Sequence, residues 1–194
     1  MRYPNDEKLR LFIAIELDKS LKEFLKSLQN ELKKCGADVA WVKPENIHLT
    51  LKFLGEAIPE SVARISSLLE ETAGLLPPFS LSITHVGWFP TQGHMRIIWV
   101  GCEEGKNESA RLAVYLADKL RELGFRKEER GFSPHITIGR VRSKRNLYSL
   151  RKTLENFSFK TPLTQTVNHL TLFKSTLTPQ GPIYEALQTF PLKA

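Results

Sequence analysis

The chain contains few cysteines and no long apolar stretch. Cys35 and Cys102 are its two cysteines, and neither has a neighbour at the spacing of metal ligands. A disulfide framework would need more cysteines in a small secreted chain, so both thiols are expected to be reduced and in or near a core. The longest apolar stretches, such as Leu11 to Ile15, are too short for a membrane span or the centre of a secretion signal. These absences predict a cytoplasmic protein that has no contact with a membrane.

The sequence also lacks a recognisable linker. No stretch rich in proline, glycine and serine divides the 194 residues, and no segment has low complexity. Hydrophobic residues make up 41% of the chain, which is enough for a sizeable core. Residues 1–194 are therefore expected to form one domain.

Acidic side chains are scarce in one part of the second half. The net charge is +7, and residues 1–97 hold equal numbers of basic and acidic side chains. Residues 126–152 alone carry nine Lys or Arg and only two Glu. Such a run is either a solvated face or a binding surface for phosphate, because arginine binds phosphate oxygens in pairs and basic surfaces attract polyanions.

One short motif is repeated. A histidine followed two places later by threonine occurs three times in a chain with five histidines, at residues 48–50, 135–137 and 169–171. Successive side chains of a strand point to opposite faces, so each histidine shares a face with its threonine at a distance of about 6–7 Å. Each motif therefore presents one imidazole and one hydroxyl on the same side.

Strand parity also assigns the neighbouring side chains. Leu49, Leu51 and Phe53 are expected to point into the core, as is Ile138 in the second motif. Arg140 has the parity of Ile138, which favours a side chain that leaves the face shared by the histidine and the threonine.

The predicted elements occur in a recurring order. Apolar–polar alternation predicts strands, and apolar residues at helical spacing predict helices. Strands are predicted at 9–17, 47–54, 79–89, 96–102, 134–141 and 166–175, and helices at 18–36, 59–76, 107–125 and 145–157. Helices interleaved with mostly antiparallel strands indicate an α+β fold of two pseudo-symmetric lobes, each a mostly antiparallel sheet with helices on its outside. If the two lobes face each other, both histidine motifs line a cleft between the lobes.

The two halves of the chain resemble each other. Each half runs from a helix through a His-x-Thr strand to a second helix and a further strand, which predicts an internal duplication whose second copy begins near residue 105. His48 and His135 occupy equivalent places in the two copies. His169 aligns instead with His85, and the earlier copy lacks the threonine, so His169 is expected to have only a structural role.

Two imidazoles and two hydroxyls in one cleft suit transfer at a phosphorus centre without a metal. An incoming oxygen must lose a proton while a leaving oxygen gains one, and the ordinary histidine pKa of about 6.5 suits both steps. The hydroxyls of Thr50 and Thr137 can donate to the non-bridging phosphate oxygens, where negative charge grows. Acid and base catalysis each supply about 10²–10⁴-fold, which is enough for a strained cyclic phosphate ester. The spacing does not distinguish which of His48 and His135 is the acid.

These residues resemble a known family, the 2H phosphoesterases, and within it the bacterial and archaeal RNA 2',3'-cyclic phosphodiesterases, also called 2'-5' RNA ligases. The resemblance covers nearly the whole chain and rests on the segments "LRLFIAIEL", "ENIHLTLKFLGE", "RGFSPHITIGRV" and "STLTPQGPIYEAL". It implies a bilobal α+β fold, hydrolysis of terminal 2',3'-cyclic phosphates to 2'-phosphates, and 2'-5' ligation as a related reaction. It also implies that no metal or other cofactor takes part. The substrates would be RNA ends or nucleotide 2',3'-cyclic phosphates, and no obligate protein partner is inferred.

The resemblance further implies a role for each residue of the two motifs. His48 would be the proton donor to the departing 3' oxygen, and His135 would be the proton acceptor that activates water. Thr50 and Thr137 would hold the phosphate. Arg130 is a further candidate for substrate binding, because the family often has an arginine at its place.

Other residues near the motifs have a structural and a functional interpretation. Arg140 also stands where the family often has arginine. The candidates for stacking on a base are Trp41, Trp88, Phe89 and Phe132, although aromatic residues near strands are usually part of a core. Ser175 and Tyr184 flank the turn "TPQGP", which predicts a hairpin, and are expected to be structural.

Two alternatives belong to other functional classes. The first is a nucleotide- or RNA-binding module that keeps the cleft but does not turn over, and the intact histidines of both motifs argue against it. The second is a metal-dependent hydrolase that uses His48, His135 and His169. No carboxylate or cysteine recurs at ligand spacing around these histidines, which argues against a metal site.

Overall fold

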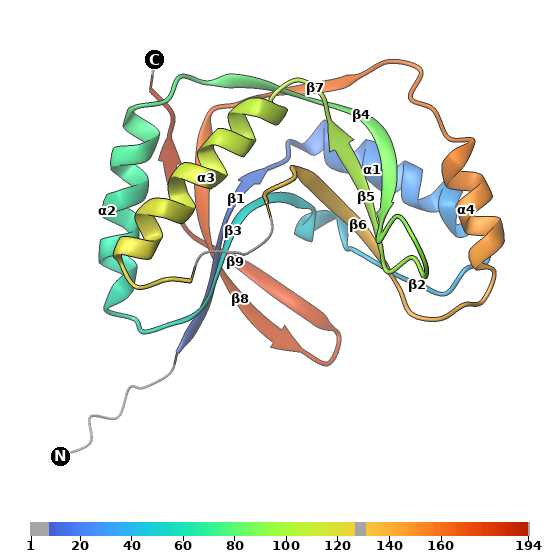
Figure 1. Ribbon diagram of the computed structural model, residues 1–194, viewed down its shortest axis with the longest axis horizontal. Helices are drawn as coiled ribbons and strands as arrows, with labels where there is room; N and C mark the ends of the chain where they lie inside the picture. The colour runs from blue at the N-terminus through green and yellow to red at the C-terminus, as the bar shows by residue number, and fades with distance from the viewer. Residues whose placement is uncertain (1–7, 127–130, 194) are drawn as a thin grey trace.

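A computed structural model of the chain describes residues 8–126 and 131–193 (Figure 1). The strands are β1 (Leu9–Glu16), β2 (Val39–Trp41), β3 (His48–Ala57), β4 (Phe79–Phe89), β5 (Ile97–Cys102), β6 (His135–Val141), β7 (Leu163–Val167), β8 (His169–Thr178) and β9 (Gly181–Pro191). The helices are α1 (Lys19–Lys33), the short 3-10 helix η1 (Pro44–Asn46), α2 (Ser61–Gly74), α3 (Lys106–Glu122) and α4 (Leu147–Glu155). Within these two described ranges, no helix is both long and apolar enough to cross a membrane.

The strands form one antiparallel sheet that divides into two lobes. The order along the sheet is β7-β4-β5-β6-β3-β1-β8-β9, and β2 pairs with β6 outside this path. At the centre, the described residues pair β3 with β6 only at Leu49 and Ile136. The two central strands therefore touch near their starts and diverge from there, which leaves a cleft between the lobes.

Each lobe takes elements from both halves of the chain. In the first lobe, α2 contacts β8 and β9, and α3 contacts β3. In the second lobe, α1 contacts β7 and α4. Figure 1 shows α2 and α3 on one side of the molecule and α1 and α4 on the other, with strands between them. The predicted α+β architecture of two antiparallel lobes with outer helices is confirmed. The strand order places four strands on each side of the boundary between β3 and β6.

Helix α1 illustrates how the core forms. Its leucines recur at helical spacing on one face, and all of them are buried, at Leu21, Leu25, Leu28 and Leu32. The carboxylate of Asp18 accepts a hydrogen bond of 2.8 Å from the backbone N–H of Leu21, which caps the first turn.

The predicted strand 166–175 is wrong in one respect, because the structure divides it at Asn168. β7 pairs with β4 in the second lobe, whereas β8 pairs with β1 in the first. The chain therefore crosses from one lobe to the other at this point. β8 then turns into β9, so the hairpin predicted around residues 178–182 is confirmed.

A β-bulge in the first motif strand reverses the parity that the sequence predicts. Thr50 pairs with Ala14 of β1, but Lys52 pairs with the adjacent Ile13, so that Leu51 is an extra residue. Beyond the bulge, Lys52 is buried and Phe53 is 56% exposed on the cleft side. The expectation that Phe53 enters the core is therefore wrong.

The second motif strand has a bulge at the equivalent place. Thr137 pairs with Trp99 of β5 and Gly139 with the adjacent Ile98, which leaves Ile138 as the extra residue. Arg140 consequently returns to the face of Thr137 and lines the cleft. The parity argument, which turned Arg140 away from the cleft, is wrong for the same reason.

Candidate active site

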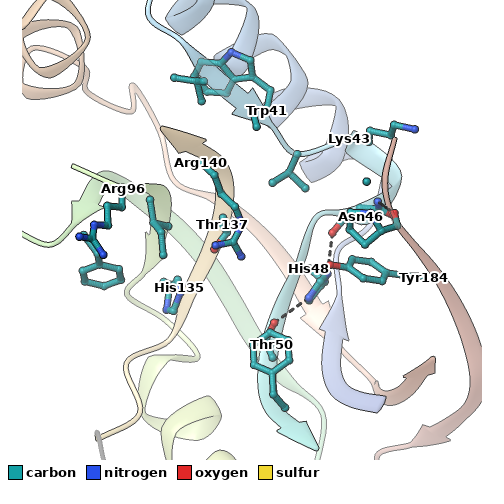
Figure 2. A pocket seen from close by; sticks show the side chains of 18 of the residues that line it. Trp41, Lys43, Asn46, His48, Thr50, Arg96, His135, Thr137, Arg140 and Tyr184 are labelled. Carbon is teal, nitrogen blue, oxygen red and sulfur yellow. Dashed lines mark hydrogen bonds between the residues drawn. The ribbon is translucent and has the colours of Figure 1, made fainter. Parts of the chain in front are cut away.

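The cleft between the lobes contains a cavity of about 1470 Å³. His48 and Thr50 line it from β3, and His135 and Thr137 line it from β6 (Figure 2). The structure thus brings together the four motif residues that the sequence selects, although they belong to opposite halves of the chain.

The single β3–β6 pair explains why the two motifs meet. Leu49 and Ile136 are directly opposite, and each motif histidine precedes its paired residue by one position. His48 and His135 are therefore diagonal neighbours on one face; such residues lie about 7–8 Å apart in a regular ladder, and their Cβ atoms are somewhat closer. One phosphoryl group can fit between two imidazoles so placed.

Both ends of the His48 ring have hydrogen-bond partners. Nδ1 lies 2.8 Å from the backbone carbonyl of Asn46, which can only accept, so Nδ1 carries the proton. In the neutral ring, Nε2 then accepts from the hydroxyl of Thr50 at 2.9 Å. Figure 2 draws both contacts. Nε2 of His48 and the hydroxyl of Thr50 therefore lie side by side in the cavity.

His48 lies on an aromatic surface inside the first lobe. Its ring is stacked on Phe12 at a centroid distance of 4.9 Å and meets Tyr184 edge-on at 5.3 Å. Burial lowers the pKa of His48 from 6.5 to about 4, against the opposing effect of the hydrogen bond to Asn46. Lys22 lowers this pKa further and Glu16 raises it. His48 is therefore neutral at neutral pH when the cleft holds no anion.

His135 has the same backbone support in the second lobe. Its Nδ1 donates to the carbonyl of Ser133 at 2.8 Å, two residues earlier, as the His48 ring does to Asn46. Its ring meets Phe89 edge-on at 5.2 Å and Trp99 at 6.4 Å. Each Nδ1 is thus held by a backbone carbonyl, which directs each Nε2 away from that carbonyl.

The cavity is lined by cations without any acidic side chain among its described residues. Lys43, Arg96, Arg140 and Arg142 contribute exposed positive charges, and Figure 2 shows the first three. Arg140 also acts across the cleft, because its charge lowers the pKa of Tyr184, which burial raises overall. The cavity therefore favours an anion.

The remaining candidates from the sequence differ in whether they line the cavity. Arg130 lies outside the described residues. Trp41, Phe89 and Phe132 line the cavity, whereas Trp88 is stacked under the guanidinium of Arg151, 5.4 Å from its ring centroid.

Tyr184 lines the cavity beside His48, although the sequence predicts only a structural role. The predicted hairpin could have indicated this position, because its turn sets Tyr184 opposite Ser175 and thereby fixes the face of the sheet on which the Tyr184 ring lies. Arg96 and Lys43 had no motif to mark them in the sequence.

The third His-x-Thr motif holds a carboxylate and does not line the cavity. Thr171 donates to the Glu16 carboxylate at 2.9 Å, and Nε2 of His169 lies 3.4 Å from the same oxygen. In the part of the chain that the structure describes, no three His, Cys, Asp or Glu side chains converge in a group that could hold a metal ion.

Two histidine–threonine pairs that face one cleft of an antiparallel α+β fold define a 2H phosphoesterase. A model of the 2'-5' RNA ligase superfamily matches residues 18–178. The chain belongs to this superfamily. An RNA 2',3'-cyclic phosphodiesterase of Archaeoglobus fulgidus is 39% identical over 94% of this chain and 99% of its own length. A protein of the same name from Thermotoga maritima is 35% identical over 92% of this chain and 93% of its own length.

Solved structures agree with this assignment. TT0787 of Thermus thermophilus superposes with a TM-score of 0.79 at 28% identity, covering 95% of this chain and 98% of its own. E. coli LigT complexed with 3'-AMP superposes with a TM-score of 0.78 at 26% identity, covering 97% of this chain and 100% of its own. The similarity spans both lobes and therefore includes the cleft.

Proposed function

We propose that the protein is an RNA 2',3'-cyclic phosphodiesterase that hydrolyses the cyclic phosphate of an RNA or nucleotide end to a 2'-phosphate. The observation that carries this proposal is the meeting of His48 and His135, each with its threonine, at one anion-attracting cavity. Relatives that carry this name match almost the full length of the chain. The reaction needs no metal and no other cofactor in this scheme, and RNA ends or cyclic nucleotides are its partners.

The proposed reaction uses the two imidazoles on opposite sides of the phosphorus. Nε2 of His135 takes a proton from water as the water oxygen bonds to phosphorus. The bond from phosphorus to the 3' oxygen breaks, and His48 gives that oxygen a proton. Thr50 and Thr137 donate to the non-bridging oxygens, which carry growing negative charge. Arg130 is retained as a candidate substrate contact.

The donor role of His48 depends on the substrate. With a pKa of about 4 in the free protein, His48 holds a proton only at acidic pH. An anionic phosphate within a few ångströms favours the charged imidazolium and raises the pKa. Thr50 must also release Nε2 of His48, and the phosphate offers its hydroxyl a new acceptor. Substrate binding thus favours the protonated form of His48 and frees its Nε2, so that His48 can donate a proton.

A single assay distinguishes the proposed activity from a non-catalytic binding module and from a metal-dependent hydrolase. The pure protein is incubated in excess chelator with adenosine 2',3'-cyclic phosphate, and the product is resolved into the 2'- and 3'-phosphates. A 2'-phosphate formed under chelation supports the proposal. Binding without product would indicate a non-catalytic module, and activity restored only by added metal would indicate a metal-dependent hydrolase. The same preparation, offered a cyclic-phosphate end and a 5'-hydroxyl end, tests 2'-5' ligation.

We place the activity in the cytoplasm, with no obligate protein partner. Cys35 and Cys102 are both free, and Cys102 is buried, as expected for thiols that remain reduced. The four motif residues that line the cavity belong to a single chain, which is consistent with this proposal.

A further inference from the structure

We propose that the cavity binds the last three nucleotides of an RNA strand, with the two upstream phosphates held along β6. This inference rests on the proposed function and extends it from the reacting phosphate to the strand behind it. The cavity volume of about 1470 Å³ exceeds the usual range of about 300–1,000 Å³ for small-ligand pockets. A cyclic mononucleotide would leave much of it empty.

A line of three side chains leads away from the reacting phosphate, two of them on β6 and the third just after its last residue. Thr137 lies at the site of the reacting phosphate, and Arg140 and Arg142 follow it along the wall of the cavity. The bulge at Ile138 is what puts Arg140 back on this face. Alternate positions of a strand are about 6.5–7 Å apart. This spacing is comparable with that of consecutive phosphates in an extended single strand, so each position can meet one phosphate.

The charges on this line are available to a ligand. Among the residues that the structure describes, no carboxylate forms an ion pair with Arg96, Arg140 or Arg142, and all three are exposed. Arg96 lies beside the far end of β6, because its carbonyl accepts a hydrogen bond of 2.9 Å from the N–H of Val141. Arg96 and Arg142 therefore flank the same part of the cavity, where the third phosphate from the end would lie.

Aromatic side chains accompany the charges, as in other sites for single-stranded nucleic acid. Phe89 of β4 pairs with Ile97 of β5, which in turn pairs with Arg140, so Phe89 and Arg140 share one face of the sheet, and both line the cavity. This part of the cavity thus offers charges to the backbone and a ring to a base.

The test is a length series. Cyclic-phosphate substrates of one, two, three and four nucleotides are compared at fixed salt. The value of kcat/KM is expected to rise about tenfold with each added phosphate up to three nucleotides and then to stay constant, because each of these phosphates gains a hydrogen bond to a charged side chain. In parallel, binding of labelled oligonucleotides that end in a 3'-phosphate is measured, so that affinity is tested independently of turnover.

Two variants locate the contacts. Arg140→Gln should reduce the gain from one to two nucleotides, and Arg142→Gln the gain from two to three, each about tenfold. Each should also make the slope of log affinity against log salt less steep by about 0.7 for the trinucleotide. Arg64→Gln is the matched control, because Arg64 is exposed on α2 and does not line the cavity. It removes the same charge and should change none of these ratios.

The results separate this inference from the proposed function. If the cyclic mononucleotide is hydrolysed but neither kcat/KM nor affinity rises with length, the inference is wrong and the proposed function stands. Equal effects of Arg142→Gln and Arg64→Gln would also overturn it. If nothing is hydrolysed but affinity rises to three nucleotides and falls in Arg142→Gln, the inference holds and the proposed function fails.

Discussion

At the scale of single residues, the two catalytic candidates share their backbone support but differ in their surroundings. Both rings donate from Nδ1 to the carbonyl two residues earlier. His48 is enclosed by the rings of Phe12 and Tyr184, and burial lowers its pKa to about 4. A histidine that is neutral until an anion arrives is suited to donate a proton only when substrate is bound. This difference supports the assignment of His48 as donor, which the spacing of the motifs leaves open.

The assignment predicts different effects of leaving-group chemistry. His48→Ala and His135→Ala should each lower turnover of a 2',3'-cyclic phosphate by about 10²–10⁴-fold. With a nitrophenyl phosphodiester, whose leaving group needs no proton, His48→Ala should recover most of its activity, whereas His135→Ala should not. Steady-state rates on both substrates measure this. Recovery in His135→Ala instead would exchange the two roles, and near-normal rates in either variant on the cyclic phosphate would refute both.

The lowered pKa of His48 also predicts a loss of stability in acid. The unfolded chain binds a proton at this residue below pH 6.5, whereas the folded protein binds it only near pH 4. Stability from this group is therefore present above pH 6.5 and is lost as the pH falls toward 4. Between pH 7.5 and 5, the wild type should lose about 1–2 kcal/mol more than His48→Asn, at about 1.4 kcal/mol for each unit of pKa. Urea unfolding at both pH values checks this, and equal losses would contradict it.

The third motif should tolerate substitution. His169 and Thr171 both contact Glu16, outside the cavity, so His169→Ala removes one partner of a half-exposed carboxylate and no contact with the substrate. We expect kcat/KM to change by less than about threefold, since exposed ion pairs contribute about 0–1 kcal/mol. A fall comparable with that of His48→Ala would place His169 in the reaction.

At the scale of elements, the sequence predicts the strands and helices better than the faces of the strands. Alternation locates β3, β4 and β6, and the repeat pairs His48 with His135. The bulges at Leu51 and Ile138 cannot be read from either strand alone, because they depend on the register with β1 and β5. For this reason the sequence predicts the wrong face for Phe53 and Arg140. The sequence does not predict the division between β7 and β8, because this division depends on which lobe each strand joins.

Packing between strands β4 and β5 gives a prediction at this scale. A Cβ at Gly87 would lie 2.4 Å from the indole of Trp99, which is itself stacked on Phe89 at 5.0 Å. Gly87→Ala should therefore displace Trp99 and destabilise the protein by about 1–3 kcal/mol. Thermal unfolding should show a lower midpoint. Gly74→Ala is the control, because nothing lies within 4 Å of its Cβ, and an equal loss there would contradict the explanation.

At the scale of the whole molecule, the two halves of the chain are interlocked. Strand β4 belongs to the first half but pairs with β5 and β7 in the second lobe. Strand β8 belongs to the second half but pairs with β1 in the first lobe. Helices α1 and α3 likewise lie on the lobe opposite to their own motif strand. We therefore expect the repeated sequence to form one cooperative domain, because neither half contains a complete sheet or its covering helices.

Because each half of the chain supplies strands and helices to both lobes, we expect the two halves to fold only together. The loop between β4 and β5 is exposed around Gln92, so the chain can be divided into fragments 1–92 and 93–194. Each fragment alone exposes one face of its strands and should show no cooperative thermal transition, whereas an equimolar mixture should regain one and, with it, hydrolysis of the cyclic phosphate. Circular dichroism and a turnover assay before and after mixing measure both. A cooperative transition in either fragment alone would mean that a lobe is an independent domain and that the halves are merely adjacent.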